Sequence, residues 1–112
     1  MNPIRAAMIA VLVLFTPATG ATTILGSGGA SCGTWTGDRQ RNEARSQLNQ
    51  AWVLGYVSGY NIHKSAQDGM TKPMDTRTMM LWIDNYCDAN PTRDISDAAK
   101  ALIDELTGRA EK

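Results

Sequence analysis

The sequence has 112 residues, of which 11 are Lys or Arg and 11 are Asp or Glu, so its formal net charge at pH 7 is zero. This length predicts one small domain, and 43% hydrophobic residues suffice for a packed core. The charge balance, with no basic run beyond the interrupted series Arg39, Arg41 and Arg45, excludes a dedicated nucleic-acid-binding protein.

The N-terminal segment has the pattern of a secretory signal peptide. Arg5 supplies a positive charge ahead of the apolar run Ala6–Phe15, which is much shorter than the roughly 20 residues of a transmembrane helix. Small residues follow at 17–21, as cleavage by a signal peptidase requires. We therefore expect residues 1–21 to be a signal peptide and the mature protein to be periplasmic or secreted, without a membrane span. A buried helix or an uncleaved anchor is the alternative.

The two cysteines, Cys32 and Cys87, both follow this segment. An even pair in a short exported chain is typical of a disulfide, which would close a loop of about 56 residues and stabilise the domain by roughly 4 kcal/mol. Cys32 also follows Gly29-Ala30-Ser31, which resembles a lipoprotein processing site, but it lies far beyond the apolar run. A catalytic thiol would need a free cysteine and a histidine partner.

Residues 22–31 are mostly Gly, Ser, Thr and Ala and predict a flexible leader before a single helical domain at 32–112. The glycines at 26–29 do not form a phosphate-binding loop, because no strand precedes them and no Gly-Lys-Ser/Thr follows.

A long first helix is expected from Asp38, as N-cap, to Tyr60 or Asn61. Gly55 and Gly59 are costly inside a helix, and their spacing predicts that another backbone passes close to them. Residues four apart define its expected apolar face, with small residues beside them: Leu48, Trp52, Tyr56 and Tyr60, flanked by Ala44, Ala51, Gly55 and Gly59.

Two further helices complete the predicted fold. One begins after Asp75 as N-cap and ends near Asp88, before Asn90-Pro91, with a loop at 61–72 preceding it. The last covers about 95–107, with Asp94 or Ser96 as cap and a glycine stop. Because no segment alternates like a strand, the expected class is all-α, with three helices held by one disulfide.

Catalytic and metal chemistry find little support in the sequence. His63 is the only histidine and lies in a polar segment, where a solvated side chain is expected. Asp84 and Asp88 are one helical turn apart, yet two carboxylates without further ligands make a weak metal site, so a solvated acidic face is expected. We expect no enzyme activity, no metal and no cofactor.

The aromatic residues are numerous for so small a domain. Most belong in the core, but Trp and Tyr tolerate partly wet positions, and Trp35 and Tyr60 in particular could serve either the core or an interface. The candidate surface for a client or partner comprises Trp35, Trp52, Tyr56, Tyr60 and Trp82.

Three segments resemble the periplasmic acid-stress chaperone family of the HdeA and HdeB type: Ser31–Trp35, Trp52–Tyr60 and Asp84–Pro91. Members of that family are small exported helical proteins in which an early Cys is bridged to a Cys just before an Asn-Pro helix stop. Exported immunity proteins of the Tai type, which neutralise secreted amidase toxins, are similar in size and helical content.

The resemblance implies a chaperone that acts after strong acid protonates its carboxylates. The mature chain would then carry a net charge of about +12, which loosens packing and keeps complexes with unfolded proteins soluble. The alternative is a specific binding or immunity protein that caps one partner. The expected partners are therefore proteins, either unfolded clients or one specific partner, and the chain could also pair as a homodimer.

Overall fold

The computed structural model describes residues 23–64, 69–70 and 72–109, so the predicted signal peptide lies outside the described residues. Within the described part the chain is helical and contains no β-strand. Its elements, in order, are a 3₁₀ helix η1 (Gly26–Gly29) and the α-helices α1 (Cys32–Arg41), α2 (Glu43–Lys64), α3 (Thr76–Ala89) and α4 (Ile95–Thr107).

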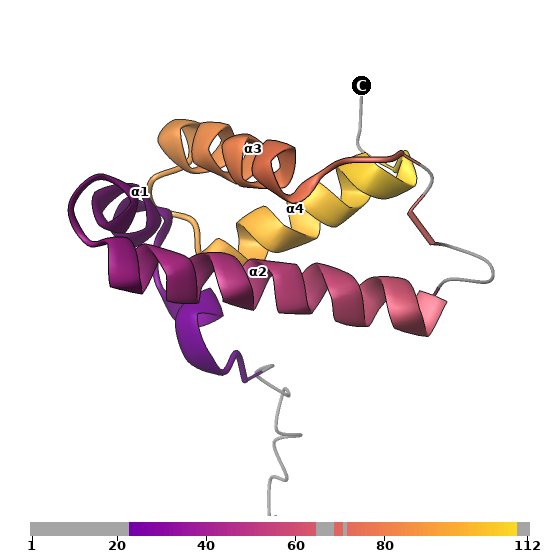
Figure 1. The fold of residues 1–112 in the computed structure, drawn as a ribbon, viewed down its shortest axis with the longest axis horizontal. Coiled ribbons are helices and arrows are strands. Elements are labelled where there is room, and N and C mark those ends of the chain that lie inside the picture. Colours follow the sequence, from indigo (N-terminus) through magenta and orange to yellow (C-terminus); the bar gives the residue numbers. More distant parts are fainter. Residues whose placement is uncertain (1–22, 65–68, 71, 110–112) are drawn as a thin grey trace, which may run out of the picture.

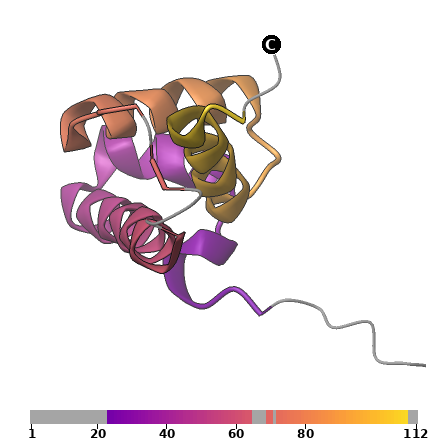
Figure 2. The same cartoon turned by 90° about the vertical axis from the view of Figure 1, so that its right-hand side faces the viewer.

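In the view of Figure 1, the helix α4 runs between α2 and α3. It packs against α2 and α3, with η1 and α1 also in contact with it. The longest helix, α2, lies along one side, α3 lies on the other, and α1 closes the end where both α2 and the turn after α3 begin (Figures 1 and 2). The all-α class is thus confirmed, with four α-helices in place of the expected three.

The expected first helix is in fact two helices. Asp38 is not an N-cap but lies within α1, which begins six residues earlier, at Cys32. Ser31 caps α1, because its hydroxyl accepts the Thr34 backbone N–H at 3.1 Å. Asn42 then interrupts the helical run and caps α2, since its side-chain oxygen accepts the Arg45 backbone N–H at 3.1 Å. The later end of α2, at Lys64, takes in part of the segment expected to be a loop.

Residues 24–31 are not a flexible leader. Four of them form η1, which contacts both α2 and α4, and Gly28 is buried. The backbone continues as part of the fold, because the Ala30 carbonyl accepts the Ile95 N–H at 2.9 Å and Ser31 forms an isolated antiparallel bridge with Asp94.

The helices α3 and α4 agree with the sequence predictions. Asp75 caps α3 by accepting the Thr78 backbone N–H at 2.8 Å. Asp94 and Asp97 form a capping box at the start of α4, and Gly108 ends that helix with a φ of 75°, in the left-handed region that glycine favours.

The apolar face expected for α2 is right only in part, because Trp52, Tyr56 and Tyr60 are half-buried and pack against the core but the other members are exposed. Leu48 is 66% exposed, while the buried residues of α2 are Ser46, Asn49, Val53 and Val57. Gly55 and Gly59 have open space around them, so no second backbone of the described chain passes close. The hydrophobic core instead comprises Cys32, Trp35, Val53, Val57, Met79, Met80, Ile83, Cys87, Ile95, Ala98, Ala99, Leu102, Ile103 and Leu106.

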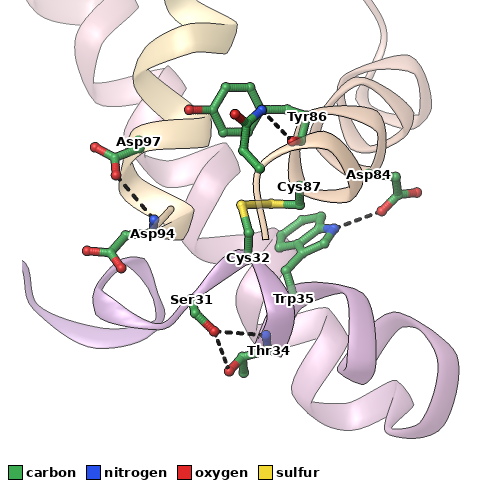
Figure 3. The surroundings of a disulfide bond; sticks show 10 residues. Ser31, Cys32, Thr34, Trp35, Asp84, Tyr86, Cys87, Asp94 and Asp97 are labelled. Atoms are coloured by element: carbon green, nitrogen blue, oxygen red, sulfur yellow. Dashed lines mark hydrogen bonds between the residues drawn. A yellow bond between two sulfur atoms is a disulfide. The ribbon is translucent and has the colours of Figure 1, made fainter. Parts of the chain in front are cut away.

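The predicted disulfide between Cys32 and Cys87 is confirmed, and both side chains are fully buried (Figure 3). It joins the first residue of α1 to the last turn of α3. Next to it the Cys32 N–H donates to the Arg93 carbonyl at 2.7 Å and the Gly33 N–H donates to the Pro91 carbonyl at 3.1 Å. The start of α1 is therefore held to the α3–α4 turn by covalent and backbone bonds together.

Candidate protein-binding surface

A polar network beside the disulfide links α1 to α3 through Asp84. The indole N–H of Trp35 donates to Asp84 Oδ1 at 2.8 Å, and Trp35 itself has no exposed surface (Figure 3). Of the residues proposed for a client surface, Trp35 is therefore a core residue and forms no part of the folded protein's exterior. Its buried N–H has the partner that a buried polar group needs.

The guanidinium of Arg39 completes this network by bidentate contact with the same carboxylate. Its Nε lies 2.9 Å from Asp84 Oδ1 and its Nη2 lies 2.7 Å from Oδ2. This hydrogen-bonded carboxylate raises the pKa of Arg39. Asp84 is thus a bridging residue rather than part of a purely solvated acidic face, whereas Asp88 is exposed.

The remaining proposed surface residues are half-buried and lie on the outer parts of α2 and α3. Trp52 stacks on Tyr56 with ring centroids 5.3 Å apart, and Trp82 stacks on Tyr86 at 5.8 Å. Burial and the nearby Asp104 carboxylate raise the pKa of the Tyr56 hydroxyl. These two stacked pairs keep ring surface close to solvent.

Tyr60 lies one turn further along α2 and meets the C-terminal end of the described chain. Arg109 donates a hydrogen bond to its hydroxyl, and the Arg109 guanidinium lies 5.6 Å from the centre of the ring. Tyr60 therefore ties the end of α2 to the residues after α4.

An apolar groove separates α2 from α3. It encloses about 330 Å³. Ile62, at its rim, is 79% exposed, so a large aliphatic side chain stands at the mouth of the groove without cover from the described residues. The lining is Leu54, Val57, Ser58, Asn61, Ile62, Met70, Thr76 and Met79.

Trp52 also makes a contact that the sequence analysis did not foresee. Its indole N–H donates to the Leu25 backbone carbonyl at 2.7 Å. A Cβ added to Gly28 would lie 2.0 Å from the Trp52 ring, so only glycine allows this approach. The composition of 22–31 resembled a linker, and nothing in it distinguished Gly28 from its neighbours.

Other chemistry finds no support in the geometry of the described residues. His63 is exposed near the end of α2, as expected for a solvated side chain. Across residues 23–64, 69–70 and 72–109, no cluster of three or more His, Cys, Asp or Glu side chains could hold a metal ion. No helix in these ranges is both long enough and apolar enough to cross a membrane.

Comparisons of this chain with protein-family models, with curated proteins and with solved structures found no match.

Proposed function

We propose that this protein is an exported, acid-activated holdase chaperone, a non-enzymatic protein of the periplasm that resembles the HdeA and HdeB type. The observation that carries the proposal is that three carboxylates make polar side-chain contacts that hold separate segments of the described chain together. Asp84 joins α3 to α1, Asp38 accepts the Asn49 side-chain amide at 2.9 Å and joins α1 to α2, and Glu105 pairs with Lys72 at 3.3 Å.

Strong acid weakens each of these carboxylate contacts. A protonated carboxyl no longer attracts Arg39 or Lys72, and the unopposed basic groups repel one another. The disulfide does not titrate, so the start of α1 stays attached to the end of α3 while the other contacts weaken. Partial opening, rather than complete expansion, is the outcome that this combination supports.

Partial opening would expose apolar surface that already lies near solvent. The groove between α2 and α3 and the half-buried rings of Trp52, Tyr56 and Trp82 require only small displacements to become accessible. Exposed apolar surface of this kind binds unfolded chains without demanding a particular sequence. The positive charge of the acid form would keep the complexes dispersed.

The test follows the oxidised mature protein from pH 7 to pH 2 with the dye ANS and with the aggregation of an unrelated client protein. We expect reversible ANS binding and client protection to appear together below about pH 3. The substitution Ile62→Ser, which makes one residue of the groove polar, should weaken protection of the client protein. Leu81→Ser is the matched control, because Leu81 is 50% exposed on α3 but does not line the groove. A protein that stays folded and inactive down to pH 2 would contradict the proposal.

The second candidate is a specific binding or immunity protein, and the groove rimmed by exposed Ile62 is the observation that favours it. A single partner would fill the groove of the folded protein at neutral pH, without acid. Ile62→Ser would then abolish binding of that partner at pH 7, where the chaperone proposal expects no activity.

A further inference from the structure

The segment of residues 24–30, here called the strap, contacts both α2 and α4 and meets α2 at Trp52. At α2 the strap is held by the hydrogen bond from the Trp52 indole to the Leu25 carbonyl and by the packing of Gly28 against the ring. At α4 its last residue, Ala30, accepts the Ile95 N–H through its carbonyl. The Leu25 side chain is 76% exposed and contributes no burial to this contact. Trp52 thus holds the strap mainly through its backbone.

Contact through the backbone makes the site tolerant of sequence. An indole N–H can donate to the carbonyl of any residue, and a flat ring can cover any stretch of chain that has glycine at the point of closest approach. A hollow of about 280 Å³ beside the strap, lined in part by Ser27, Ala30 and the exposed Leu48, offers room for one side chain. The requirements are those of a short peptide with glycine at the point of contact.

We propose that Trp52 and Leu48 form a peptide-binding surface, which the strap occupies in the folded protein and which accepts glycine-containing segments of unfolded proteins when the strap is displaced. This inference rests on the proposed chaperone function and specifies one client-binding site for it. The strap acts as an internal competitor, because a tethered segment is present at an effective concentration in the millimolar range. A free peptide therefore binds weakly until the strap leaves.

Three substitutions add the same side chain to the strap, and two of them are expected to displace it at neutral pH. Gly28→Val places its Cβ inside the Trp52 ring, and Gly26→Val strains a residue whose φ is 74°. Gly29→Val is the matched control, because the nearest atom to its Cβ is the Ile24 carbonyl oxygen at 3.8 Å, an ordinary contact. Gly26→Val displaces the strap by a different physical effect, so it provides the test if the Gly28 variant fails to fold.

The probe is a fluorescein-labelled peptide with the sequence of residues 24–30, Ile-Leu-Gly-Ser-Gly-Gly-Ala, titrated into full-length mature protein at pH 7. We expect the Gly28 and Gly26 variants to bind it at least about tenfold more tightly than the unsubstituted protein and the Gly29 variant do. Adding Trp52→Ala to either variant should remove that gain. Equal affinity in all folded variants, or a gain that survives Trp52→Ala, would overturn the inference.

The same variants, measured both for peptide binding and for client protection, distinguish a failure of this inference from a failure of the proposed function. If the unsubstituted protein protects a client at pH 2 but the displaced-strap variants bind no more peptide at pH 7, the function stands and the strap inference is wrong. If peptide binding rises as expected but no protein protects a client in acid, the Trp52 surface exists and the acid-chaperone proposal is wrong.

Discussion

At the scale of single residues, Asp84 joins two side chains of α1 to α3. Asp84 accepts a hydrogen bond from the buried indole N–H of Trp35 and forms an ion pair with Arg39, whose side chain is 31% exposed. These two roles differ physically, since the first needs only a hydrogen-bond acceptor and the second needs a negative charge. Substitutions can separate them.

Asp84→Asn keeps an acceptor oxygen for Trp35 but loses the charge opposite Arg39, so we expect a loss of about 1 kcal/mol in the free energy of unfolding. Asp84→Ala also leaves the buried indole N–H without a partner and should cost about 2–3 kcal/mol. Urea unfolding at pH 7 with the disulfide intact measures both. Equal losses for the two variants would show that the Trp35 hydrogen bond contributes little.

The N-cap of α3 gives a pH dependence with a definite sign. Hydrogen bonds from Thr78 lower the pKa of Asp75 in the folded state below its ordinary value of 3.8. The stabilisation is therefore complete above that ordinary value and is lost as the pH falls through the lower, folded-state pKa. We expect the melting temperature of the unsubstituted protein to exceed that of Asp75→Ala at pH 6 and the two to converge as the pH falls through the lowered, folded-state pKa of Asp75. A difference that grows in acid would contradict this assignment.

At the scale of the elements, α2 contains two glycines that do not serve a close approach. A Cβ added to Gly55 or Gly59 meets no other atom of the described chain within 4 Å. We expect Gly55→Ala and Gly59→Ala each to stabilise the monomer by about 0.5–1 kcal/mol, because alanine restricts the unfolded chain and favours helix. Thermal unfolding at low protein concentration measures this. Destabilisation would instead indicate that a second copy packs on these glycines.

Helices with clear end signals could be predicted from the sequence. Asp75, Asp94 and Gly108 mark the ends of α3 and α4, and both helices contribute buried residues to the core, among them Ile83 and Leu102. Their local preferences and their packing agree, so pattern alone was sufficient. The disulfide followed in the same way from the number and position of the two cysteines.

The errors lie where long-range contacts decide the local structure. α1 contains two glycines and several polar residues, and only Cys32 and Trp35 are buried, so it has no apolar stripe to recognise. The disulfide and the Asp84 network hold it in place from α3. On α2 the spacing of Leu48 and the aromatic residues suggested a face, but the core selects Val53 and Val57 together with two hydrogen-bonding polar residues.

The burial of the aromatic residues could be predicted only in part, for the same reason. Trp52, Tyr56, Tyr60 and Trp82 are half-buried, whereas the interior position of Trp35 depends on an acceptor 49 residues away. The contact between Trp52 and Gly28 joins residues that no local pattern relates. Such pairings appear only when the elements are assembled in space.

At the scale of the whole molecule, the disulfide sets how far the chain can expand. We expect the double substitution Cys32→Ser, Cys87→Ser to lower the free energy of unfolding by roughly 4 kcal/mol at pH 7. In acid the oxidised protein should stay more compact than this variant, and small-angle scattering at pH 2 compares their radii. Equal radii would show that other contacts limit the expansion.

The bonds and contacts that hold the helices together are unevenly distributed between the two ends of the domain. At the end near α1 lie the disulfide, the Asp84 network and the backbone bonds to residues 91–95. The contacts at the other end are noncovalent and include the Lys72–Glu105 pair, the bond from the Lys72 N–H to the Leu106 carbonyl, the bond from the Met70 N–H to the Asn61 side chain and the Tyr60–Arg109 contact. Amide hydrogen exchange should therefore form a gradient, slow in α1 and fast in the last turns of α2. Subglobal opening would begin beside the groove, so that the apolar lining meets solvent well before the cross-linked end separates.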